Sequence, residues 1–245
     1  MTSPSLTLHH LQCSQAERIP WLLEELGLPY DLKPYKRAPI FGPPELKAVH
    51  PLGASPVLED ATSDPSSPLI LAESGAIADY IIYKYGNGRL ALAPSHANYA
   101  DYLYWFHFAN GNLQPAVMRC MTAKSLASPD NPRVKMAEDH LQTVFSHVNE
   151  RLKKNTWLAG DEFTAADIMS LFCFTTMRKF MPADLTNYPG IVAWVRRCAD
   201  RPAYQAAMKK GDPELDIGDL VNERPPEMFE ALKMMISQQA QAQNN

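Results

Sequence analysis

The sequence predicts an α+β protein in which a small sheet domain comes first and an all-helical region follows. Apolar runs of strand length are confined to the first part of the chain, at 5–11, 30–35, 57–58 and 69–71. After residue 95 the apolar residues recur at helical spacing, and no run has a convincing strand pattern. The segment 86–95 (GNGRLALAPS), which contains Gly and Pro, separates the two halves and predicts a linker.

The composition is that of an ordinary globular chain and disfavours several classes of function. The 245 residues are 46% hydrophobic and 20% charged, with a formal net charge of -4. This balance disfavours nucleic acid as a partner, because nucleic-acid binding needs a basic face. No apolar run approaches the length of a membrane span. The opening MTSPSLTLHH lacks the basic and apolar regions of a signal peptide, so we expect a cytoplasmic protein.

The cysteines predict neither a disulfide framework nor a metal site. The four cysteines are scattered, with no CxxC pair and no Cys/His spacing of zinc type. Disulfides among them are not expected in a reducing compartment. We therefore expect no metal cofactor.

The first half predicts a βαβ unit, a short helix, two further strands and a helix. Ser14 and Glu17 have the spacing of a capping box, which opens a helix that Gly27 is placed to end. Pro20 inside this helix is expected to bend it. A short helix is predicted over 45–49. This order of elements is the layout of a thioredoxin-like domain.

The stretch 50–80 contains the features that point to a ligand. Ser55-Pro56 lies in a tight turn and is a candidate cis peptide. A bend there leaves the backbone of Ser55 free to pair with an extended ligand. Ser74 is placed to cap the next helix, whose first amides attract a carboxylate, and Glu73 beside it suits an ammonium group. The pattern fits a peptide-like ligand with an α-amino acid end, and equally a hairpin and a capped helix that bind nothing.

The second half is predicted to be helical throughout. Thr164 and Asp167 form a second capping box, before a helix that is apolar on nearly all sides and therefore predicted to be buried. Other helices are predicted over 98–121, 132–153, 191–200, after Pro202 and around 226–239. We divide the chain into domains at 1–88 and 95–211 and a C-terminal extension at 212–245.

A series of different short motifs extends from residue 5 to residue 210. The first helix reads SQAERIPWLLEEL from Ser14, and LPY, YKR, PPELKAVHPLG, SPVL and AESGAI follow it. The second half contains GNLQP, the capping box before Asp167, and YP-I-W from Tyr188. Together these motifs resemble the cytosolic glutathione S-transferase superfamily, and most closely its fungal and bacterial Ser-type members. The tail after Gly211 lies outside the resemblance.

The resemblance implies a thioredoxin-like domain that binds glutathione, a helical domain that forms most of the electrophile pocket, and a homodimer. It implies that the turn at Ser55 pairs with the cysteinyl part of glutathione and that His50 lies near the glycyl carboxylate. It implies that Glu73 and Ser74 hold the γ-glutamyl end. The catalytic residue is then Ser14, and the expected glutathione-binding residues are Cys13, His50, Ser55, Pro56, Glu73 and Ser74.

Two residues of the first loop are candidates for the chemistry. A glutathione thiol at the start of the first helix feels the helix dipole, and the Ser14 hydroxyl can donate a hydrogen bond to the thiolate; both effects lower the thiol pKa. The thiolate then attacks an electrophilic carbon or an activated peroxide. Family branches with a cysteine in this loop perform thiol–disulfide exchange through a mixed disulfide, which makes Cys13 the alternative. A third reading leaves Ser14 as a helix cap only.

Two departures from the family pattern remove positive charge from the expected glutathione site. Gln15 stands where the subgroup often has Arg, and Ala54 stands where a basic residue is common. His50, Lys47 and Lys36 are candidates to compensate. A glutathione-transferase-like binding or regulatory protein with little activity is therefore an alternative of another class.

The favoured function is conjugation of glutathione to hydrophobic electrophiles, in detoxification or secondary metabolism, with glutathione peroxidase activity considered beside it. Asn110, Arg119 and the aromatic run over 99–108 are candidates for the electrophile pocket, although aromatics at helical spacing also predict core or dimer interface. Arg18 is expected to serve the fold or an interface.

Overall fold

The computed structural model describes residues 3–243. Its strands are β1 (Leu6–Leu11), β2 (Asp31–Tyr35), β3 (Val57–Asp60) and β4 (Leu69–Ala72). Its α-helices are α1 (Arg18–Leu26), α2 (Leu46–Val49), α3 (Ser74–Lys84), α4 (Tyr99–Phe108), α5 (Gln114–Leu126), α6 (Pro132–Lys154), α7 (Ala165–Leu171), α8 (Pro189–Ala199), α9 (Pro202–Gly211), α10 (Ile217–Leu220) and α11 (Glu230–Gln243).

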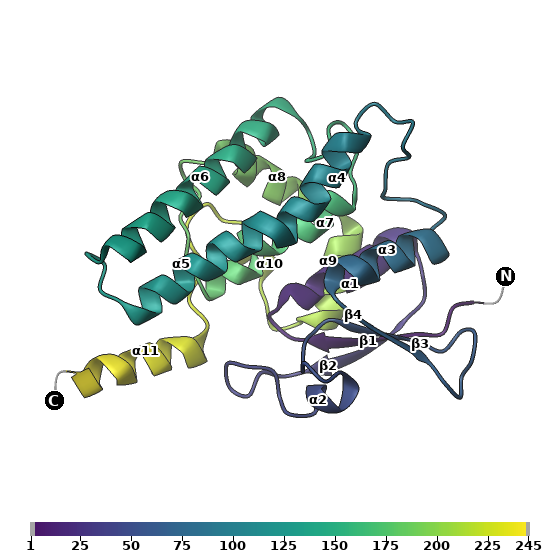
Figure 1. Cartoon of the computed structure of the whole chain (residues 1–245), viewed down its shortest axis with the longest axis horizontal. Coiled ribbons are helices and arrows are strands. Elements are labelled where there is room, and N and C mark those ends of the chain that lie inside the picture. The colour runs from purple at the N-terminus through teal and green to yellow at the C-terminus, as the bar shows by residue number, and fades with distance from the viewer. Residues whose placement is uncertain (1–2, 244–245) are drawn as a thin grey trace.

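The first part of the chain folds into a four-stranded mixed sheet in the order β2-β1-β3-β4. β1 pairs with β2 in parallel, with Leu8 opposite Leu32, and with β3 antiparallel, with Leu8 opposite Leu58. Figure 1 shows α1 and α3 on one face of this sheet and α2 on the other. Leu8, Leu58 and Ile81 are fully buried where α3 meets the sheet. The predicted thioredoxin-like domain is therefore confirmed.

The start of the first helix differs from the prediction in two ways. The chain enters it through a 3₁₀ turn, Gln15–Glu17, and Glu17 bonds to residues of the helical domain instead of returning to Ser14, so there is no capping box here. Pro20 lies in the first turn of α1, where its missing amide has no helical partner to lose. The predicted bend at Pro20 stays a prediction. Gly27 ends the helix at φ 65, as expected.

The second part of the chain is helical, with α7 at its centre. Every residue of α7 is buried, and α7 packs against α1 of the sheet domain and against α4 and α8. The capping box at Thr164 and Asp167 is present, as predicted. Asp167 also accepts hydrogen bonds from the Trp194 indole at 2.8 Å and from the Leu158 amide at 3.0 Å. This carboxylate thus joins α7 to α8.

The helix predicted over 98–121 is interrupted by a π-helical turn at Ala109–Leu113, which joins α4 to α5. A π-helical turn inserts one residue into the helix and so changes the direction of the side chains on either side of it. This turn lies above the start of α3 and contributes to the candidate site described below.

The chain beyond α9 runs back along the body before it leaves it. The buried Arg178 guanidinium donates hydrogen bonds to four backbone carbonyls of this segment. They are those of Leu220 at 3.3 Å, Asn222 at 2.8 Å, Glu223 at 3.1 Å and Arg224 at 2.6 Å. α11 begins at Glu230, later than the predicted 226, and lies apart from the other helices (Figure 1). Within residues 3–243, no helix combines the length and the hydropathy that crossing a membrane requires.

Candidate functional site

The loop that joins β1 to the first helix meets the turn at Ser55. The Leu11 amide donates to Ser55 Oγ at 2.9 Å, and this Oγ donates to the His9 carbonyl at 3.2 Å. The Gln15 side-chain amide donates to the Ser55 carbonyl at 3.3 Å. The peptide between Ser55 and Pro56 is cis, as predicted. Residues about 40 positions apart are thereby held as one surface at the start of the first helix.

Ser14 is the N-cap of the first helix. Its backbone is extended (φ -141), and its Oγ accepts a hydrogen bond from the Ala16 amide at 3.1 Å. The hydroxyl proton goes to the Leu11 carbonyl at 2.7 Å. Both hydrogen-bonding functions of this hydroxyl are therefore used within the loop.

Cys13 is held by its backbone on both sides. Its φ is 53, in the left-handed region, its amide donates to Asp212 Oδ1 at 2.5 Å, and its carbonyl accepts from Arg37 at 2.6 Å. Burial, with the Asp212 carboxylate adding to it, raises the pKa of the Cys13 thiol to about 12. The thiol is therefore protonated at neutral pH, unlike the thiolate that disulfide exchange requires.

The start of α3 differs from the predicted cap. Glu73, at φ 71, is the N-cap, and Ser74 is the first helical residue. The predicted capping by Ser74 is therefore wrong, because its buried Oγ bonds elsewhere. It accepts hydrogen bonds from Arg18 at 3.1 Å and from the Asn110 side-chain amide at 3.3 Å. A glutamate in the left-handed region is uncommon, and such residues concentrate at functional sites.

Arg18 connects the two domains beneath this site. Its guanidinium is fully buried and donates to the side-chain oxygens of Gln15 at 3.3 Å, Asn110 at 2.9 Å and Gln114 at 2.8 Å, in addition to Ser74. The π-helical turn directs Asn110, and the helix after it directs Gln114, onto Arg18. None of the salt bridges found among the described residues involves Arg18. This network was not predicted from the sequence, although Gln114 lies in the GNLQP motif.

Glu17 lies beside this cation without forming an ion pair with it. Its buried carboxyl accepts hydrogen bonds from the hydroxyls of Thr175 at 3.3 Å and Thr176 at 2.5 Å. Burial raises the pKa of Glu17 to about 8. The group is therefore mostly protonated at neutral pH and does not neutralise Arg18.

Comparison with known proteins decides the family. A model of the glutathione S-transferase N-terminal domain matches residues 12–82, and a model of the C-terminal domain matches residues 111–202. Glutathione S-transferase 1 of Saccharomyces cerevisiae is 30% identical over 229 residues, which cover 86% of this chain and 97% of the yeast protein. The chain belongs to the glutathione S-transferase family. The family, the fold class and the class of enzyme predicted from the sequence are thereby confirmed.

Solved structures agree with this assignment. A glutathione S-transferase from Actinobacillus pleuropneumoniae is 33% identical, with a TM-score of 0.77 over 87% of this chain and 95% of that one. A glutathione transferase from Phanerochaete chrysosporium, solved with oxidized glutathione, has a TM-score of 0.68 over 85% and 96% of the two chains. Its identity is 22%, so it supports the fold alone.

Three further residues predicted for the transferase site are His50, Asn110 and Arg119. His50 ends α2, and its buried Nδ1 has no hydrogen-bond partner in the described part of the chain. Asn110 points at Arg18 and Ser74, whereas Arg119 is exposed on α5. Among residues 3–243, no group of three or more His, Cys, Asp or Glu side chains could hold a metal ion.

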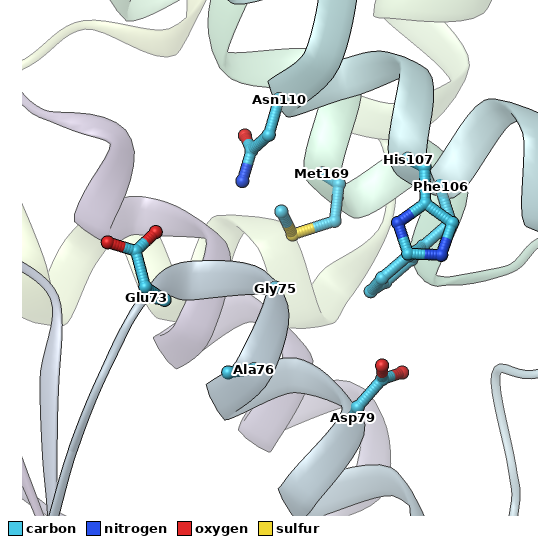
Figure 2. A pocket seen from close by; sticks show the side chains of 8 residues that line it. All are labelled: Glu73, Gly75, Ala76, Asp79, Phe106, His107, Asn110 and Met169. Carbon is cyan, nitrogen blue, oxygen red and sulfur yellow. The ribbon is translucent and has the colours of Figure 1, made fainter.

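A cavity of about 210 Å³ begins at Glu73 and follows α3 beneath α4. Figure 2 shows Glu73 at one end, Asp79 at the other, and the side chains of Met169 and Asn110 between them. Burial raises the pKa of Asp79. Of the predicted aromatic run, only Phe106 lines this cavity; Tyr102, Trp105 and Phe108 are buried core residues, and Tyr104 is exposed.

Proposed function

We propose that this chain transfers glutathione to hydrophobic electrophiles, with the glutathione thiol ionised at the start of the first helix. The observation that carries the proposal is the junction between the Ser14 loop and the cis-Pro turn, where Leu11 bonds to Ser55 at 2.9 Å. A ligand that pairs its backbone with Ser55 presents its cysteinyl thiol to this helix end. The partial positive charge there lowers a thiol pKa.

The other contacts of glutathione follow the same surface. The γ-glutamyl carboxylate is proposed to bind at the first turn of α3, where the Arg18 guanidinium lies behind Ser74 at 3.1 Å. Glu73, which is exposed and has no capping hydrogen bond, is proposed to take the γ-glutamyl ammonium group. The unpaired Nδ1 of His50 is proposed for the glycyl carboxylate. These assignments keep the predicted roles of His50, Ser55, Glu73 and Ser74.

The chemical step needs no protein nucleophile. The bound thiol loses its proton to solvent, and the Ser14 hydroxyl exchanges the Leu11 carbonyl, now at 2.7 Å, for the stronger charge-assisted bond to sulfur. The thiolate then forms a carbon–sulfur bond to the electrophile, and the leaving group departs with the electron pair of its own bond. In a peroxidase reaction the same thiolate forms a sulfur–oxygen bond to the hydroperoxide as the O–O bond breaks, which gives the sulfenic acid of glutathione. The alkoxide leaves with the O–O electron pair and takes a proton from water.

The pKa of the bound glutathione thiol can be measured directly from the ultraviolet absorbance of the thiolate. Bound glutathione is titrated against pH in the wild type and in Ser14→Ala. We expect the pKa of the bound thiol to lie below that of free glutathione and to rise in the variant. Ser14→Thr keeps a hydroxyl and a helix cap and serves as the control. An unshifted thiol pKa in the wild type contradicts the proposal.

The alternatives have separate readouts. The protonated thiol and bound amide of Cys13 disfavour a Cys13-dependent thiol transferase. Retention on glutathione resin without turnover of a panel of electrophiles or of an organic hydroperoxide would favour a binding protein. The cytoplasmic location and the role in detoxification or secondary metabolism stay predictions.

The predicted homodimer is supported by exposed apolar side chains. Large hydrophobic side chains that are exposed in the single chain lie on β4, α3 and α4, namely Leu69, Ile70, Tyr83, Leu103 and Tyr104. Two copies joined through these elements would remove such side chains from water. Sedimentation of the wild type should give a dimer, and Tyr83→Glu should shift it toward monomer. A monomeric wild type contradicts this part of the proposal.

A further inference from the structure

The segment at the end of α9 holds the loop that carries Cys13 and Ser14. The Asp212 carboxylate is buried and divides its two oxygens, because Oδ2 accepts from His10 Nε2 at 2.9 Å and Oδ1 accepts from the Cys13 amide at 2.5 Å. The preceding carbonyl, that of Gly211, accepts from the Gln12 side chain at 3.0 Å. Gly211 and Asp212 thus hold Gln12 and Cys13 of the loop and His10 near the end of β1.

The closeness of this contact requires glycine at position 211. A Cβ built there would lie 2.9 Å from His10 Nε2, closer than side-chain packing permits. Gly211 therefore allows the backbone after α9 to reach β1, and Asp212 follows it into the buried space. The contact is a built feature of the fold and not a surface ion pair.

We propose that Asp212 is a positioning residue that directs this transferase to the glutathione thiol by keeping Cys13 out of thiol–disulfide chemistry. The inference rests on the proposed function, in which the reacting sulfur belongs to glutathione. The Asp212 carboxylate accepts the hydrogen bond of the Cys13 amide and lies beside the loop. The amide then has no hydrogen bond to give to an anionic sulfur, and the carboxylate repels one.

The reaction that Asp212 suppresses can be written in full. The Cys13 thiolate would attack one sulfur of glutathione disulfide, form a Cys13–glutathione mixed disulfide and release one glutathione thiolate. Its rate depends on the fraction of Cys13 present as thiolate. The raised pKa of the thiol, with burial as its largest cause and Asp212 as its next, agrees with this suppression.

Other charged groups face the loop and also affect the equilibrium between the thiol and the thiolate of Cys13. The Arg37 guanidinium donates to the Cys13 carbonyl at 2.6 Å and favours the thiolate. The remaining groups are Glu17, which disfavours the thiolate, Lys179, which favours it, and His10, which bonds to Asp212 itself. Asp212 alone both contacts the Cys13 amide and disfavours the thiolate, so its removal is the informative change.

The test is the rate of Cys13 alkylation by iodoacetamide between pH 6 and pH 10, followed by peptide mass spectrometry. Asp212→Asn keeps the shape of the side chain and removes its charge. We expect about 10-fold faster alkylation of Cys13 at pH 7.5, the effect of lowering a thiol pKa by one unit, and a mixed disulfide with glutathione disulfide. Asp212→Glu, which keeps the charge, should stay slow.

The matched control is Glu214→Gln, which removes an exposed carboxylate of the same segment that pairs with Lys36. It should leave Cys13 alkylation unchanged. Alkylation of buried Cys173 would reveal a variant that has opened as a whole. In that event Asp212→Glu decides, because a variant that keeps the charge must alkylate Cys13 as slowly as the wild type.

Equal alkylation rates in Asp212→Asn and the wild type overturn the proposal, as does a wild-type rate that levels off before pH 9. Cys13 alkylation can be measured in a protein that has no S-transfer activity. If the thiol pKa of glutathione bound to the wild type is not lowered while Asp212→Asn releases Cys13, the proposed function fails and the role of Asp212 stands. S-transfer by Asp212→Ala/Cys13→Ala, which removes the hydrogen bond to the loop amide, reports the effect on loop position, and we expect kcat/KM to fall by about 10-fold.

Discussion

Two helix starts in this molecule carry a serine, and the serines do different things. Ser14 has an extended backbone and caps its helix, so its hydroxyl is used within its own loop. Ser74 is already helical, because Glu73 before it takes the left-handed cap position. Its hydroxyl is therefore free to accept from Arg18 and Asn110. The Ser14 hydroxyl therefore bonds within its own loop, whereas the Ser74 hydroxyl joins two domains.

In the proposed function the chemistry and the binding lie at separate ends of one surface. At Ser14 the proposed reaction requires only that one hydroxyl proton be redirected. At Ser74 a buried guanidinium and three side-chain amides are already in place before a ligand arrives. Substitutions around Ser74 should therefore lower stability and the affinity for glutathione, and substitutions at Ser14 should lower turnover.

The largest effect is expected from Arg18→Met. The variant leaves the hydroxyl of Ser74 and the amide oxygens of Asn110 and Gln114 without their buried donor. We expect the free energy of unfolding to fall by about 3 kcal/mol, measured by urea denaturation. Arg196→Met, which removes a half-exposed guanidinium from α8, is the control and should cost less than about 1 kcal/mol. Equal losses would contradict a special role for the Arg18 network.

Ser14→Ala should act on turnover. We expect kcat/KM for a chlorodinitrobenzene electrophile at neutral pH to fall by about 10- to 1000-fold, the range for losing one hydrogen bond to developing charge. The lost cap should lower the free energy of unfolding by only about 1 kcal/mol. An unchanged rate would remove Ser14 from the mechanism and leave it as a cap.

Glu17→Gln should change the dependence of stability on pH. The folded-state pKa of Glu17 is raised to about 8 from 4.5, so the native state binds a proton that the unfolded chain releases. The contribution of Glu17 is fully present below pH 4.5 and is lost as pH rises through about 8. Between pH 6 and pH 8 the wild type should therefore lose about 2 kcal/mol relative to the variant. Parallel urea midpoints across this range would contradict the assignment.

The smallest effect is expected from Ser74→Ala. Without its Oγ, Arg18 still has three amide partners, so the fold should persist. Loss of a polar contact to glutathione should raise KM for glutathione by about 10-fold and leave kcat within a factor of about 3. A fall in kcat with unchanged KM would place Ser74 in the chemistry and remove the distinction between the two helix starts.

Much of the fold followed from local pattern. The four strands, the cis peptide before Pro56, the end of α1 at Gly27 and the capping box at Thr164 depend on residues within a few positions of one another. The predicted site residues were likewise found by motif. The errors at Glu17 and Ser74 share one cause, because each side chain has a partner far away in the sequence that competes with its own helix end.

The sequence by itself determined the order of elements, the family and the loops from which a glutathione site would be built. These depend on backbone propensities and turn chemistry, which act over a few residues. Only the tertiary structure decided which serine caps, that Arg18 is buried among amides 92 and 96 positions away, and that Asp212 binds the Cys13 amide across 199 positions. The physical reason is burial, since a charge removed from water must take whatever hydrogen-bond partners the packed chain brings to it.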